Sequence, residues 1–269
     1  MNGKDYGWAA GLLALAAFIW LRDRSWLSSP EDTMPLFAAP VLFFILAGGR
    51  AAFARSDRAV AGNRSRLITA AAALILGMAL NLTFLLAVAW TLFLAVWLQS
   101  RVAPEQWPTH RRLLVLALLA FPWLSEDVPQ LGWWFRLTAA WTAAQFFQLI
   151  GFSVVRDGTG LTVQGLPVAV TAACSGLTAL QAMLVAGTVL AFSQLGDRRW
   201  YWWAVGVLPL VAWGANTLRV MMLSSVALTF GTAAAQGWFH EWGGWFVLVS
   251  MFALCWGVFA AGRRWLPKS

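Results

Sequence analysis

Charged residues are scarce in this sequence. They make up 11% of the 269 residues, whereas hydrophobic residues reach 60%; an ordinary soluble domain carries about 25% charge. A soluble protein of this size could not hide so much apolar surface, so lipid must be the solvent for most of it. We therefore expect an all-α polytopic membrane protein whose single integral membrane domain covers residues 1–269.

Residues that commonly bind metals are also few. The chain has two histidines and two cysteines, and no acidic cluster accompanies them. Because a protein metal site usually gathers three or four such ligands, no metal site is expected. No glycine-rich phosphate-binding loop is present either, so the sequence predicts no cofactor.

Basic residues nevertheless outnumber acidic ones, and the net charge is +8. They cluster in short loops between apolar segments, which is typical of the positive-inside rule rather than of nucleic-acid binding. The arginine-rich loop 50–66 is expected in the cytoplasm, and alternation then places loop 99–112, loop 197–199 and the C-terminal tail there too. The bilayer is thus the expected partner, and nucleic acid is not.

Apolar runs predict about eight transmembrane helices in the cytoplasmic membrane. They cover residues 7–21, 34–49, 67–81, 82–98, 112–124, 176–196, 200–217 and 241–262. The first run could pass for a signal peptide, but charged residues follow it at 22–24 in place of a small-residue cleavage site. We read it as a retained helix. His110, beside two arginines in a cytoplasmic loop, is expected to be solvated.

Segment 133–155 does not fit the alternation. If it crossed the membrane, the arginine pairs at 198–199 and 263–264 would fall outside. It carries a polar stripe, so we expect a helix in the outer interface. Asp157-Gly158 and Gln164-Gly165 are turn signals between β-prone runs. They predict a short β-hairpin on the outer surface that leads to Cys174.

Three polar residues reach the same depth. Cys174, Arg219 and His240 each lie about 20–24 residues from a cytoplasmic arginine, roughly 30–36 Å along a helix. This distance is about one hydrocarbon thickness. The sequence therefore predicts a cysteine, an arginine and a histidine together at the outer edge of the membrane.

These residue types suit acyl transfer by a cysteine. A histidine or a helix N-terminus favours the thiolate of Cys174. Backbone N–H groups at Ser175 and Gly176 could bind an oxyanion, and Arg219 could add a fixed positive charge. Asn216, one turn before Arg219, could orient His240 or a substrate carbonyl.

Each residue also has a plainer interpretation. Cys174 could be a packing residue, His240 an interfacial residue among tryptophans, and Arg219 a side chain that extends to the lipid headgroups. Cys255 serves as the internal comparison. It lies about 22 Å deeper than His240 on a helix, and is expected to be packing only.

The motifs ACSGL at 173–177 and N-x-x-R-V at 216–220, with a histidine about 20 residues later, resemble the exosortase/archaeosortase family. The resemblance covers residues 120–262, the exosortase-like catalytic region, whereas 1–119 resembles the family mainly in being helical. It implies that Cys174 is the nucleophile, that Arg219 stabilises the transition state and that His240 transfers protons.

The resemblance further implies a membrane-anchored substrate protein with a C-terminal sorting tail, cut at the outer face through a Cys thioester. Transfer to an acceptor and hydrolysis both remain open, as does the oligomeric state. The alternative is a non-catalytic transporter or scaffold linked to surface-polysaccharide export. A thiol-dependent acyltransferase acting on lipid is a further alternative.

Overall fold

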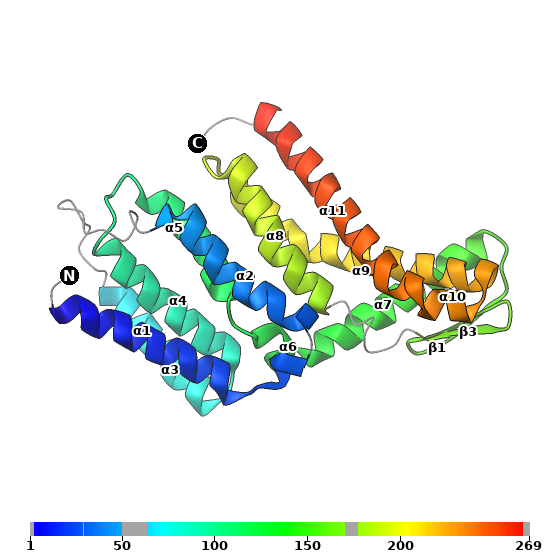
Figure 1. The fold of residues 1–269 in the computed structure, drawn as a ribbon, viewed down its shortest axis with the longest axis horizontal. Coiled ribbons are helices and arrows are strands. Elements are labelled where there is room, and N and C mark those ends of the chain that lie inside the picture. The colour runs from blue at the N-terminus through cyan, green and yellow to red at the C-terminus, as the bar shows by residue number, and fades with distance from the viewer. Residues whose placement is uncertain (1–2, 29, 50–63, 170–176, 266–269) are drawn as a thin grey trace. The chain divides into compact units, whose positions relative to one another are not determined.

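The computed structural model describes residues 3–28, 30–49, 64–169 and 177–265. The described chain is mostly helical, as expected for a membrane protein, with a small three-stranded sheet (Figure 1). It divides into two compact units, residues 1–127 and 128–269. Each of the eight apolar runs coincides largely with a helix.

The N-terminal unit is built around one helix. Its elements are α1 (Gly3–Arg22), the 3₁₀ helix η1 (Ser25–Ser28), α2 (Pro30–Leu46), α3 (Arg64–Ala79), α4 (Thr83–Gln99), α5 (Trp107–Leu119) and α6 (Trp123–Asp127). Helix α4 packs against α1, α3, α5 and α6. Indole N–H groups tie the helices together: Trp90 donates to the Leu12 carbonyl at 2.7 Å, and Trp20 donates to the Ala120 carbonyl at 2.8 Å.

The C-terminal unit is arranged around α9. Its elements are α7 (Pro129–Leu149), β1 (Val154–Asp157), β2 (Gly160–Val163), β3 (Leu166–Ala169), α8 (Leu177–Leu195), α9 (Tyr201–Phe230), α10 (Thr232–Gln236) and α11 (Trp238–Trp265). Helices α8, α9 and α11 pack against one another in pairs (Figure 1). Gly187 allows α8 to approach α9, since a β-carbon there would lie 2.5 Å from Leu208 Cδ2.

The strands form two hairpins, where the sequence predicted one. The sheet is antiparallel in the order β1-β2-β3, and both predicted turn signals are turns. Gln164 and Gly165 both have positive φ, 54° and 77°, as a type I′ turn requires. Gly158 has φ 56° and opens the first turn. The second hairpin forms because β3 pairs with β2 along its full length, from Leu166 opposite Val163 to Ala169 opposite Gly160.

The sheet, α7 and α10 surround the last third of α9, and we call these elements the distal layer. Small residues on one face of α7 allow it to lie close to α9. The buried cluster comprises Ala139, Ala140, Ala143, Ala144, Phe147, Leu161, Val163 and Val220. Gln145 and Gln148, part of the predicted polar stripe, are exposed on the other side of α7. The α7 face that packs on α9 is thus mainly apolar, although Thr138 of the predicted polar stripe also contacts α9.

Two helices in the described chain are long and apolar enough to cross a membrane, Tyr201–Phe230 and Trp242–Trp265. Four shorter apolar helices lie at Tyr6–Arg22, Thr33–Leu46, Thr83–Gln99 and Leu180–Leu195. Helix α9 is longer than the predicted run 200–217, because the residues after Arg219 remain helical as far as Phe230. The apolar run alone therefore did not define the end of this helix.

Candidate functional site

Cys174, Ser175 and Gly176 lie outside the described residues. The helix that follows them, α8, begins at Leu177 and packs against both α9 and α11. Arg219 is carried by α9, and His240 by α11. The three helices that hold or follow the predicted catalytic residues are therefore mutual neighbours.

Arg219 is half-buried, and its guanidinium lies against α11. A β-carbon built on Gly244 would lie 3.0 Å from Cζ of Arg219 and 3.1 Å from both Nε and Nη2. The side chain thus crosses from α9 to the backbone of its neighbour.

His240 belongs to the first turn of α11, and its side chain lies outside the described part of the structure. Gly244 follows it by four residues, which is about one helical turn on nearly the same face. The guanidinium of Arg219 therefore lies one turn along α11 from the backbone of His240.

Asn216 precedes Arg219 by three residues on α9 and is only 1% exposed. Its neighbour Thr217 is buried as well, and the Thr217 hydroxyl donates a hydrogen bond to the Trp213 carbonyl at 2.9 Å. The indole N–H of Trp213 in turn donates to Thr138 Oγ1 of α7 at 2.9 Å. The hydrogen bond between Trp213 and Thr138 thus joins α9 to α7 within two turns of Arg219.

The expectations for Cys255 and His110 have different outcomes. Cys255 is buried on α11, in no disulfide, as expected of a packing residue. His110 was expected to be solvated, and this was wrong: it is 2% exposed. Helix α5 begins at Trp107, so His110 lies in its first turn on the packed face, where Nδ1 lies 3.0 Å from the Gln106 carbonyl oxygen.

A polar cluster in the N-terminal unit was not predicted. Arg22 Nη2 donates to Thr83 Oγ1 at 2.6 Å, and the Thr83 hydroxyl donates to Glu126. Asp127 accepts from the backbone N–H groups of Thr83 and Phe84, and so caps α4. Burial raises the pKa of the Glu126 carboxyl, and the hydrogen bond from Thr83 partly opposes this shift. The sequence did contain a sign of this cluster, because Arg22, Glu126 and Asp127 each follow closely after an apolar run.

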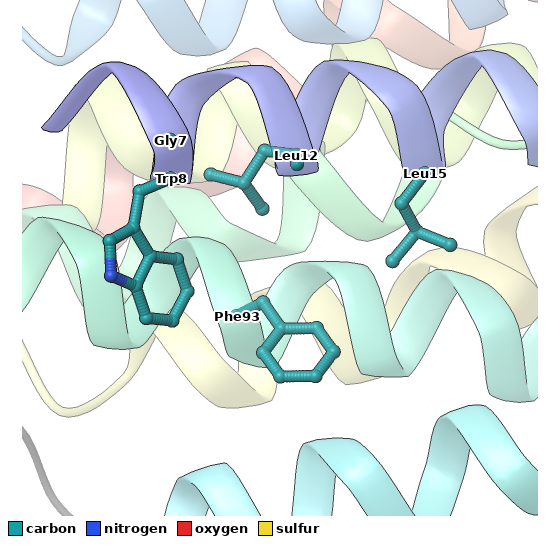
Figure 2. A pocket seen from close by; sticks show the side chains of 6 residues that line it. Gly7, Trp8, Leu12, Leu15 and Phe93 are labelled. Carbon is teal, nitrogen blue, oxygen red and sulfur yellow. The ribbon is translucent and has the colours of Figure 1, made fainter. Parts of the chain in front are cut away.

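A groove of ≈ 530 Å³ also lies in the N-terminal unit (Figure 2). It is lined by Gly7, Trp8, Gly11, Leu12, Leu15 and Phe93. None of these side chains can act as a nucleophile or a base, so the groove does not suit acyl transfer. Within the described residues, no group of three or more His, Cys, Asp or Glu side chains could hold a metal ion.

The two long apolar helices and the four shorter ones are consistent with a multi-helical membrane protein. The chain belongs to the transmembrane exosortase family: residues 4–257, nearly the whole chain, match the family described as Transmembrane exosortase (Exosortase_EpsH). The match includes the N-terminal helices, in which the sequence motifs of the family had not been found. No curated protein and no solved structure matches the chain.

Proposed function

We propose that this protein is a cysteine transpeptidase or protease that cleaves the C-terminal sorting tail of exported, membrane-anchored proteins. It works at the outer face of the cytoplasmic membrane, with about eight spans and α7 in the outer interface. The observation that carries the proposal is the guanidinium of Arg219 seated on α11, one turn from His240. Family membership supports the same chemistry.

In the proposed reaction, the Cys174 thiolate attacks the scissile carbonyl and forms a tetrahedral intermediate. Arg219 and the N–H groups near Ser175 and Gly176 stabilise its oxyanion. The intermediate collapses to a thioester as the C–N bond breaks, and His240 protonates the leaving amine. An amine or hydroxyl acceptor, or water, then attacks the thioester and releases the thiol. Asn216 orients the substrate or His240.

The first experiment measures the reactivity of Cys174. Intact cells producing the Cys255→Ala protein, in which Cys174 is the remaining thiol, are labelled with a membrane-impermeant maleimide from pH 5 to 9. The proposal predicts labelling that is rapid below pH 8, slower in a His240→Ala variant and absent in Cys174→Ala. A folded protein that fails to label contradicts the proposal and favours the transporter or scaffold.

A second experiment follows the substrate. Membrane fractions of cells producing wild type, Cys174→Ala or Cys255→Ala are compared for exported proteins that retain their C-terminal tails. Full-length, tail-bearing protein should accumulate only with Cys174→Ala. Equal processing in all three strains would contradict cysteine catalysis. If Cys174→Ala cells accumulated lipid acyl donors but no tail-bearing protein, the result would favour the lipid acyltransferase.

A further inference from the structure

Gly244 is the residue against which Arg219 rests. Gly243 and Gly257, on the same helix, do not share this contact. A β-carbon at Gly257 would meet nothing within 4 Å, and one at Gly243 would meet the ring of Phe239. A methyl group at Gly244 would instead meet Cζ, Nε and Nη2 of Arg219 at 3.0–3.1 Å. Contacts this tight require the guanidinium to give way by a few tenths of an ångström.

We propose that Gly244 is a positioning residue: its missing side chain makes the seat that fixes the Arg219 guanidinium for oxyanion stabilisation. This inference rests on the proposed function and adds a residue to that site. It goes beyond the roles assigned to Cys174, Arg219 and His240, because Gly244 has no group that can react. It acts only through the arginine.

The physical reason is preorganisation. Arginine has many rotamers, and ordering its long side chain costs entropy. A charge inside a membrane protein is also drawn toward headgroups and water. Donors that stabilise developing charge work best when they are already fixed before the reaction. A seat on the backbone of α11 holds the guanidinium at one depth, one turn from His240.

The choice of glycine is informative because it is a poor residue for the interior of a helix. Alanine has the highest helix propensity, and glycine is the least favourable residue apart from proline. At Gly257 alanine would fit without contact, whereas at Gly244 it would improve the helix and displace Arg219. Stability and catalysis should therefore change in opposite directions at Gly244 alone.

The test compares Gly244→Ala, Gly244→Leu and the matched control Gly257→Ala in purified protein. The substrate is the tail-bearing protein that accumulates in Cys174→Ala cells. Gly244→Ala shifts the guanidinium by a few tenths of an ångström and should lower kcat about 3- to 10-fold with KM unchanged. Its unfolding temperature should equal or exceed that of the wild type. Gly244→Leu should lower kcat as far as Arg219→Ala does, and Gly257→Ala should leave it unchanged.

A double-mutant cycle separates positioning from a general structural effect. If Gly244 acts through the arginine, Gly244→Ala should cause no further loss in the Arg219→Ala background. The inference would be overturned if Gly244→Ala lowered kcat by the same factor in the wild type and in the Arg219→Ala protein. It would also be overturned if Gly244→Ala had the kcat of the wild type. Processing by Cys174→Ala would instead overturn the proposed function, so the two failures are distinguishable.

Discussion

At the residue scale, Arg219 differs from an ordinary membrane arginine in the direction of its side chain. The guanidinium lies over the backbone of a neighbouring helix, at a glycine. A planar guanidinium can present two N–H groups to one oxyanion, whereas a lysine ammonium is a compact point charge on a flexible stem. The identity of the cation should therefore matter as well as its charge.

Arg219→Lys should lower kcat by about 100-fold, the range seen when one oxyanion donor is lost. The protein should remain folded, because the charge is retained. Processing rates in membranes would measure the effect. Arg156→Lys is the matched control, since Arg156 lies exposed on β1 and donates to the nearby Gly158 carbonyl at 2.8 Å. Wild-type activity of Arg219→Lys would show that the paired N–H groups of the guanidinium are not needed for catalysis.

Glu126 gives a prediction for pH. Its side chain is 5% exposed, and burial raises the pKa of its carboxyl. A raised pKa means that the folded state binds the proton more tightly than the unfolded state. This contribution to stability is present below the ordinary carboxyl value and is lost as the pH rises through the folded-state pKa.

Glu126→Gln should remove this dependence, because an amide stays neutral and can still accept from Thr83. At pH 8 the variant should unfold at a higher temperature than wild type, by about 2–4 °C for each kcal/mol gained in the free energy of unfolding. At pH 4 the two proteins should unfold at similar temperatures. Thermal unfolding in detergent across this range would test it. A wild-type advantage at pH 8 would mean that the Arg22–Glu126 attraction outweighs burial.

At the scale of elements, the turn chemistry of the sheet was readable from the sequence. Asp157-Gly158 and Gln164-Gly165 predicted reversals where the structure has them. The third strand was not foreseen, because Leu166–Ala169 is short and contains Pro167. Its pairing depends on β2, and on the contact between β3 and α9, rather than on its own pattern.

Gly165 has φ 77° with open space around it, so a substitution there acts through the backbone. Gly165→Val should destabilise the protein by about 1–3 kcal/mol, because a β-branched residue is strained in this region. Gly165→Asn is the matched control, since asparagine tolerates positive φ. Unfolding midpoints would measure both. Equal values for the two variants would show that the turn conformation does not limit stability.

The sequence also predicted the helices of the C-terminal unit better than their ends. Depth counting from cytoplasmic arginines named Arg219 as a candidate, whereas the apolar run ended at residue 217 and left the end of this helix open. The continuation to Phe230 depends on burial of Val220, Ser224 and Ala227 in the distal layer. Gly244 was equally beyond sequence reasoning, because only the path of the Arg219 side chain gives it a role.

At the scale of the whole molecule, composition alone indicated a helical membrane protein, and family membership agrees with it. Which loops lie inside and which outside is predicted from the distribution of basic residues, since each helix could in principle cross the membrane in either direction. The proposed topology places Asp157, at the end of β1, outside the membrane, and Glu105, in the loop 99–112, on the cytoplasmic side. Both residues are exposed.

This topology can be tested in a cysteine-free protein, Cys174→Ala with Cys255→Ala. A single Asp157→Cys change should be labelled by an impermeant maleimide in intact cells. A single Glu105→Cys change should be labelled only after the membrane is permeabilised. The reverse pattern would invert the topology and remove Cys174 from the outer face.

The length of α9 has a consequence for how substrates arrive. Its 30 residues extend about 45 Å, beyond a hydrocarbon layer of about 30 Å. If Tyr201 marks the cytoplasmic edge, Arg219 meets the outer edge, and the remaining turns stand above it among α7, the sheet and α10. The proposed substrate, held in the membrane by its own helix, would reach this level by lateral diffusion. The encounter rate should then follow the number of substrate molecules per unit area of membrane, rather than their concentration in solution.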